Sequence, residues 1–215
     1  MIFSVETEHE MSSASSEYHL RISEKNMKQL ITFSLLLLAS LDGAEPSGEN
    51  SSRPNIILLM GDDHGWEEVG YNGHPYIKTP FLDEMAASGL RLDNFYAQPV
   101  CSPTRGNVLT GRHPNRYGTF TPGRSLRPEE TTVAHLLRDA GYGTGHFGKW
   151  HVGPVKNGSP TNPGAMGFDE WLSHDNFFEM DPVLSRNGGT PKKFYGESSE
   201  ILIDEAINYI ERKKQ

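Results

Sequence analysis

The one cysteine of the 215-residue chain, Cys101, lies in the stretch FYAQPVCSPTRGNVLTGR at residues 95–112. A lone cysteine forms no internal disulfide, so it must have another role. Residues 94–128 contain no aspartate or glutamate. The same region contains five arginines: Arg105, Arg112, Arg116, Arg124 and Arg127. This concentration of positive charge favours an anion site or a thiolate, and a solvated basic surface is the alternative.

A pair of adjacent carboxylates, Asp62 and Asp63, follows the apolar run at 56–60. Two neighbouring carboxylates repel each other unless a cation offsets their charge, and hard divalent cations prefer such oxygen ligands. The pair could equally cap a loop or begin a helix. On its own it is a weak indication of a metal site.

Lys149 and His151 lie two residues apart in the stretch FGKWHVG, between Gly148 and Gly153. On an extended segment, side chains two apart point to the same side. The lysine offers a fixed positive charge, and the histidine can exchange a proton near neutral pH. The alternative is a surface loop with a buried Trp150.

Together these motifs resemble the sulfatase family. CSPTR followed by LTGR matches the family signature, in which Cys-x-Pro-x-Arg continues into Leu-Thr-Gly-Arg. The strand with DDHG, then KTPFLDEMAASGLRLDNFYA and GYGTGHFGKWHVG, match further landmarks in the family's order. The resemblance covers about residues 53–215. TGRHPNRYG and GFDEWLSHDNFF are similar to the arylsulfatase and N-acetylgalactosamine-6-sulfatase branch.

The resemblance implies a chemical role for Cys101. In sulfatases a maturation enzyme reads the cysteine, proline and arginine in the unfolded chain and oxidises the cysteine to Cα-formylglycine. The hydrated aldehyde is a geminal diol. One hydroxyl attacks sulfur and displaces the alcohol, and the second loses its proton and expels sulfate. The implied substrate is a sulfated carbohydrate or an aryl sulfate ester.

The resemblance also implies the partners of residue 101. Calcium would be held by Asp62, Asp63 and the residue derived from Cys101, and would polarise the sulfate. Arg105 would hold the hydrated aldehyde, Lys149 would contact sulfate, and His151 would take the diol proton.

Family members are longer and supply a second metal-binding Asp-Asn pair, a histidine and a lysine from downstream segments. We assign Asp175 and Asn176 to a loop instead, because no apolar strand is expected before Ser173. Other histidines have lesser predicted roles: His64, His74 and His113 line the cleft or lie on the surface, His135 lies on a helix face, and His146 is structural.

The elements that must position these groups alternate between strand and helix. Apolar runs predict strands at 56–60 and 90–97, and a short strand is expected in 142–153. Helices are predicted in 78–92, with Phe81, Leu82, Met85 and Ala86 on one face and Gly89 at the end, and in 102–112, capped by Ser102 or Thr104. Another is predicted in 131–142, capped by Thr131 or Thr132, with Val133, Leu136 and Leu137 facing the core. The last, in 198–215, carries Ile203, Ala206, Ile207 and Ile210 on its apolar face.

This alternation predicts an α/β fold, of the alkaline-phosphatase-like sulfatase type by resemblance, with the N-terminal part of a largely parallel sheet flanked by helices. In such folds, ligand residues gather at the carboxyl ends of strands. No strand follows the last helix to complete its crossover. We therefore expect residues 53–215 to be the N-terminal portion of a truncated catalytic domain.

The first 52 residues are expected to lie outside this domain. Residues 1–26 are predicted to be a non-native upstream extension or disordered. Residues 27–44 have the layout of a signal peptide, with a basic start and an apolar run at 30–41, and residues 45–52 form a linker. These features predict a secreted or periplasmic protein with no stable membrane anchor. The net charge of −8 gives no indication of nucleic-acid binding.

Three hypotheses follow. The first is an exported, calcium-dependent sulfatase acting on sulfate esters, chiefly of carbohydrates. The second is a catalytically inactive truncated fragment, serving as an interaction or decoy module. The third is a related phosphoester or phosphonate hydrolase.

Overall fold

The computed structural model describes residues 53–176 and 178–213. The predicted extension at 1–26, the signal peptide at 27–44 and the linker at 45–52 therefore lie outside the described residues. Residues up to Leu58 belong to one unit of the chain, and residues from Leu59 onward form the second. No helix in the described part is long and apolar enough to cross a membrane.

The second unit contains a four-stranded sheet in the order β1-β2-β3-β4. Its strands are β1 (Gly145–Lys149), β2 (Glu170–His174), β3 (Val183–Arg186) and β4 (Lys192–Lys193). β1 and β2 are parallel, and the other two pairs are antiparallel. The α/β class is confirmed, and the described sheet is mixed.

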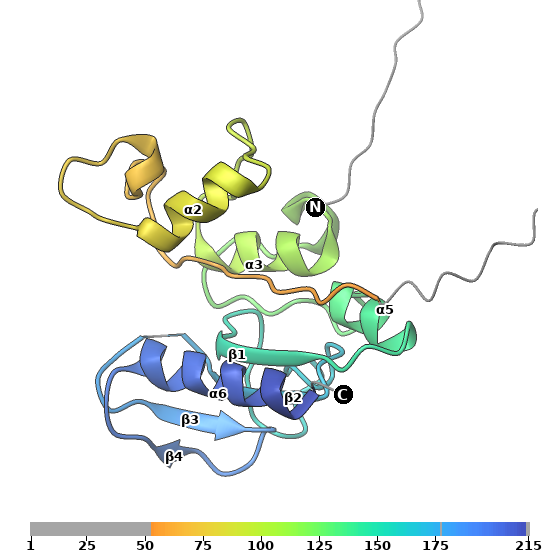
Figure 1. Ribbon diagram of the computed structural model, residues 1–215. Helices are drawn as coiled ribbons and strands as arrows, with labels where there is room; N and C mark the ends of the chain where they lie inside the picture. The colour runs from red at the N-terminus through yellow and green to blue at the C-terminus, as the bar shows by residue number, and fades with distance from the viewer. Residues whose placement is uncertain (1–52, 177, 214–215) are drawn as a thin grey trace, which may run out of the picture. The chain divides into compact units, whose positions relative to one another are not determined.

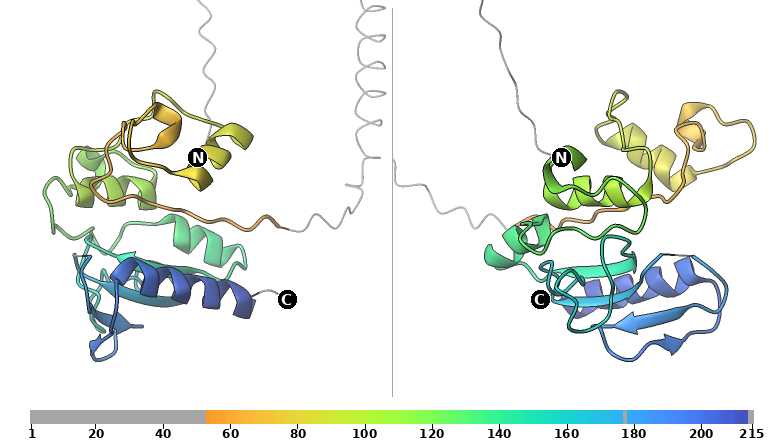
Figure 2. Two further views of the ribbon diagram at one scale, coloured as in Figure 1. Left: turned by 60° about the vertical axis from the view of Figure 1, so that its left-hand side comes forward. Right: turned by 180° about the vertical axis from the view of Figure 1, so that it is seen from behind.

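Helix α6 (Ser198–Lys213) packs against this sheet (Figure 1, Figure 2). Leu202 of the helix joins Leu172 and Leu184 of the strands in a buried cluster. The ring of Tyr209 lies 5.4 Å from that of Phe147 on β1. Helix α6 therefore covers the face of β1 and β2 that carries Phe147 and Leu172.

The remaining helices precede the sheet in the chain. They are the 3-10 helix η1 (Gly70–Asn72) and the α-helices α2 (Pro80–Ser88), α3 (Cys101–Thr110), α4 (Pro114–Tyr117) and α5 (Val133–Asp139). The predicted helices in 78–92 and 131–142 are confirmed, ending at Gly89 in the first case and capped by Thr132 in the second. Helix α3 is also confirmed, but Val100 precedes it without a side-chain cap, so the expected Ser102 or Thr104 cap is wrong.

Two predicted strands are absent from the described residues. Residues 56–60 are in no strand, and Leu59 is 68% exposed. Residues 90–97 also pair with no strand, and Tyr96 is 79% exposed. A strand buried on both faces needs a pairing partner and covering layers. The apolar run alone therefore did not determine the structure here.

The predicted apolar faces of two helices are largely exposed. On α2, Phe81 and Met85 are exposed, and on α6 so are Ile203 and Ile207. Helix α6 instead buries Leu202 and Tyr209. On α5, Ala134 is buried whereas Leu136 is exposed, contrary to the predicted core face. The spacing of the apolar residues predicted the helices correctly. Which side of each helix is buried depends on the elements that pack against it.

A second core lies under the candidate site. It consists of buried side chains from α3, α4, the loop between α4 and α5, and the segment after β1: Leu109, Tyr117, Leu126, Trp150, Val152, Val155 and Met166. Tyr117 is fully buried, and its hydroxyl donates a hydrogen bond to the carbonyl of Pro103 in α3. This contact ties the helix that begins with Cys101 to the core.

Replacing Gly106 with alanine tests this packing. A Cβ at residue 106 would lie 2.8 Å from the ring of Tyr117, which its hydroxyl bond holds in place. We expect the free energy of unfolding to fall by about 2 kcal/mol, even after the gain in helix propensity. Urea denaturation measures the change. Val108→Ala, at an exposed position on the same helix, is the control and should cost clearly less. An unchanged midpoint for Gly106→Ala would contradict the close packing.

Candidate active site

Cys101 is the first residue of α3, and its Sγ lies 3.0 Å from Nδ1 of His151. His151 has a left-handed backbone with φ 51°, which is costly for a residue with a side chain. Its N–H donates to the carbonyl of Asp175 at 2.9 Å, and its carbonyl accepts from Oγ of Ser102 at 2.6 Å. These two bonds hold the imidazole next to the sulfur.

A buried charge cluster adjoins this pair. Asp62 accepts from Lys149 Nζ at 2.7 Å through Oδ2, and from Arg105 Nη2 at 3.2 Å through Oδ1. Arg105 also donates through Nη1 to the carbonyl of Lys149 at 2.6 Å. Arg105 and Lys149 are only 8% and 6% exposed. Residues from three separate motifs therefore meet here.

Burial raises the pKa of Asp62, but the hydrogen bonds and charges of Lys149 and Arg105 lower it further, so the carboxylate is ionised. Burial, and then the positive charges of Lys149 and Arg105, lower the pKa of His151. The imidazole of His151 is thus neutral near pH 7. A neutral imidazole can take a proton from a group at residue 101.

The residues predicted to bind a metal ion make up only a partial set of ligands. Asp63 is exposed, with φ 51°, and both oxygens of Asp62 already face cationic side chains. The described residues contain no group of three or more histidine, cysteine or acidic side chains suited to a metal ion. Calcium takes six to eight oxygen ligands. These residues alone do not make a calcium site.

Asp175 follows a strand, contrary to the expectation that none precedes Ser173. Trp171 and Leu172 are buried in β2 and supply its apolar character. Asp175 itself lies in the loop after β2, as predicted. Its Oδ1 accepts from the N–H of Val155 at 2.8 Å, which fixes the chain beyond His151.

The fold neutralises much of the arginine-rich region. Arg105 faces Asp62, as described above. Arg112 and Arg127 both bind Glu130, at 2.5 Å and 2.8 Å, and the side chain of Glu130 is only 2% exposed. These acidic partners lie outside residues 94–128 in the sequence. The charge of that segment alone therefore overstates the positive potential of the folded region.

Most other histidines have local structural contacts. His146 is half-buried, its Nδ1 lies 2.7 Å from Oγ of Ser173, and the desolvation of its ring lowers its pKa to about 3. His74 and His113 accept hydrogen bonds from nearby backbone N–H groups, and His135 completes the cap of α5. The structural role predicted for His146 therefore has geometric support.

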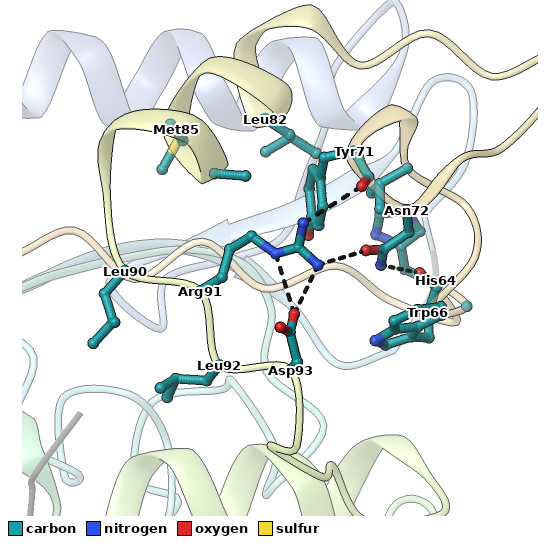
Figure 3. Close-up of a pocket in the computed structure, with 13 residues that line it drawn as sticks. His64, Trp66, Tyr71, Asn72, Leu82, Met85, Leu90, Arg91, Leu92 and Asp93 are labelled. Atoms are coloured by element: carbon teal, nitrogen blue, oxygen red, sulfur yellow. Dashed lines mark hydrogen bonds and ion pairs between the residues drawn. The ribbon is translucent and has the colours of Figure 1, made fainter.

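A separate pocket of about 360 Å³ lies among residues 64–93 (Figure 3). Its lining includes His64 and Trp66 but not Cys101 or the charge cluster. Figure 3 shows Arg91 held between Asp93 and Asn72, with hydrogen bonds at 2.7 Å and 3.1 Å. The charge of this arginine is thus already paired.

Comparisons with known proteins agree on one family. A family model described as Sulfatase matches residues 54–215. The N-acetylgalactosamine-6-sulfatase of Canis lupus familiaris is 33% identical over 213 residues, covering 84% of this chain and 40% of the relative. Arylsulfatase A of Homo sapiens is 42% identical over 153 residues, covering 66% of this chain and 28% of the relative. The chain thus spans well under half the length of these relatives.

Solved structures give the same result. BT4656 in complex with its substrate D-glucosamine-2-N,6-O-disulfate is 32% identical, with a TM-score of 0.66, over 76% of this chain and 32% of that one. Ps i-CgsB is 28% identical, with a TM-score of 0.66, over 75% of this chain and 42% of that one.

Proposed function

The chain belongs to the sulfatase family, and on this premise we propose that it hydrolyses sulfate esters of carbohydrates. The observation that carries the proposal is the 3.0 Å contact between Cys101 Sγ and His151 Nδ1, beside the buried Lys149 and Arg105. A nucleophile, a base and two cations converge at one point. That set suits transfer of an anionic sulfuryl group.

The chain's own residues have distinct roles in this proposal. His151, neutral near pH 7, takes a proton from a hydroxyl at residue 101. Lys149 offers its positive charge to the sulfate, and Arg105 orients the group at residue 101. Asp62 holds both cations in place through its two oxygens. Formylglycine at residue 101, once formed from the cysteine, supplies a hydrated aldehyde with two hydroxyls.

We further propose that a maturation enzyme acts on this chain before it folds. In the folded structure, Pro103 and Arg105 of the signature are buried and Cys101 is half-buried. An enzyme that reads these side chains could reach them only in the unfolded chain. Export of the protein, as the leader predicts, is part of the same proposal.

Calcium is the proposed metal, with Asp62 and Asp63 as the ligands that this chain offers. Carboxylate oxygens suit a hard cation. When bound, calcium would polarise the sulfate. Its further ligands would have to come from outside the described residues.

The substrate class follows from the relatives. Several of them are named N-acetylgalactosamine-6-sulfatase, and one solved neighbour holds a glucosamine disulfate as its substrate. We propose a sulfated hexosamine as the substrate of this chain. A phosphoester is the competing substrate.

Mass spectrometry of the peptide that contains Cys101 tests the modification. After expression with a formylglycine-generating enzyme, we expect an aldehyde in place of the thiol group. Turnover of a sulfate ester, measured beside the matching phosphate ester, then tests the activity. An unmodified thiol in every preparation would exclude the formylglycine assignment. A modified chain that prefers the phosphate ester would favour the related hydrolase, and one that hydrolyses neither would favour the inactive module.

A further inference from the structure

His174 is a buried histidine at the candidate site that has no role in the proposed reaction. It is the last residue of β2 and pairs in register with Lys149 of β1. The two strands are parallel, so both residues lie at carboxyl ends, where ligands bind in α/β folds. The carbonyl of His174 accepts from the N–H of Trp150 at 3.0 Å, just before His151.

One imidazole nitrogen of His174 has no hydrogen-bond partner in the described part of the chain. The residue is 8% exposed, and its Nε2 is buried with no partner among the described residues. A buried polar atom without a partner costs free energy, and native structures rarely leave one unexplained. A ligand group is the simplest partner for a nitrogen beside Lys149.

The imidazole of His174 is neutral near pH 7. Burial, followed by the charges of Lys149 and Arg105, lowers its pKa to about 4, and the opposing effects of Asp175 and Asp62 are smaller. A neutral imidazole has one donor and one acceptor nitrogen. Because its protonated form is scarce near pH 7, it is poorly suited to be a general acid.

Either tautomer of the neutral Nε2 can pair with a hydroxyl group, whereas only the Nε2–H tautomer can pair with a sulfate oxygen. The oxygens of an ionised sulfate only accept hydrogen bonds, and the ammonium group of Lys149 suits them. A sugar hydroxyl both donates and accepts. The ring of Phe178 packs edge-on against the imidazole, with ring centroids 5.3 Å apart, and is itself 41% exposed.

We propose that His174 determines substrate specificity by hydrogen bonding to a hydroxyl of the sugar that carries the sulfate ester. The inference rests on the proposed function and extends it from the sulfate to the alcohol part of the substrate. A site that hydrogen-bonds a hydroxyl discriminates strongly against analogues that lack it.

Two substrates separate this role from a structural one. The full chain, expressed with the maturation enzyme, is assayed with N-acetylgalactosamine 6-sulfate and with 4-nitrophenyl sulfate, whose alcohol part has no hydroxyl beside the ester. His174→Phe keeps a ring but removes both nitrogens. We expect its kcat/KM to fall about 10- to 100-fold for the sugar and to change less than about threefold for the aryl ester.

His174→Gln restores a donor and an acceptor and should recover part of the loss for the sugar. His113→Asn is the control, because asparagine can replace the cap that His113 provides to α4, away from the charge cluster. Equal losses for both substrates in His174→Phe, or no loss for the sugar, would overturn the inference.

A binding measurement separates failure of this inference from failure of the proposed function. If the wild-type chain hydrolyses neither substrate, the proposed function fails, and calorimetry with the sulfated sugar and with inorganic sulfate still tests His174. Tighter binding of the sugar than of sulfate, with the difference abolished in His174→Phe, would support the contact. The same difference in both proteins, or no binding of the sugar, would overturn it.

Discussion

Replacing Cys101 with serine is expected to lower multiple-turnover hydrolysis of a sulfate ester by at least about 1,000-fold. A serine hydroxyl at this position can accept the sulfuryl group, because His151 lies close enough to take its proton. Serine lacks the second hydroxyl whose deprotonation would expel sulfate. The enzyme should therefore stop after one turnover with a sulfated serine, which mass spectrometry of the intact protein detects.

Cys101→Ala is the matched control for this experiment. It should be equally inactive but should acquire no sulfate, because alanine has no nucleophile. Both variants should unfold near the wild-type temperature, since Cys101 is only half-buried at the start of α3. Sustained turnover by the serine variant would contradict the need for a second hydroxyl at residue 101.

Which residues come together at the site was more predictable from the sequence than the packing around them. Cys101, Arg105, Lys149 and His151 were identified from motifs, and the structure brings them together. Those motifs are short and local, so the residue types and spacing were enough to find them. The roles of these residues in catalysis stay predictions.

The partner of the two buried cations was not predictable from local sequence. Asp62 lies far along the chain from both Arg105 and Lys149, and the family resemblance implies only a metal-binding role for it. In the structure its two oxygens face the two cations. A pairing over such a separation is set by the tertiary fold, which no local pattern encodes.

His174 was missed for a related reason. No apolar strand was expected before Ser173, so His174 was not placed at the carboxyl end of a strand. Pairing with β1 makes Glu170–His174 a strand nonetheless, and the parallel register places His174 beside Lys149. EWLSH shows no strict alternation of apolar and polar residues, so the strand had no clear signal in the sequence.

The exposed apolar side chains show the opposite error, in which a strand is predicted from the sequence where none forms. Residues 56–60 have the composition of a buried strand, yet Ile57 is 64% exposed and pairs with no strand in the described chain. Composition states what a segment tends to bury. Whether it does so depends on neighbours that the segment itself does not supply.

Replacing Asp62 with asparagine is expected to lower the free energy of unfolding by about 3 kcal/mol near neutral pH. The carboxylate is the common partner of Arg105 and Lys149, whose side chains are 10% and 6% exposed. An amide of nearly the same shape leaves both cations buried without a counter-charge. Asp93→Asn is the control: Asp93 also pairs with an arginine, but its side chain is 63% exposed, so its loss should cost less than about 1 kcal/mol.

The pH dependence of this loss of stability distinguishes the effect of the lost charge from the effect of altered packing. The pKa of Asp62 is lower in the folded protein than its usual value, so its stabilising effect is present above the unfolded-state pKa, about 4. That effect is lost as the pH falls through the folded-state pKa. Urea denaturation from pH 7 down to about pH 3 should therefore show the wild-type advantage over Asp62→Asn shrinking in acid. An advantage that stays constant across this range would mean that shape, and not the charge of Asp62, stabilises the cluster.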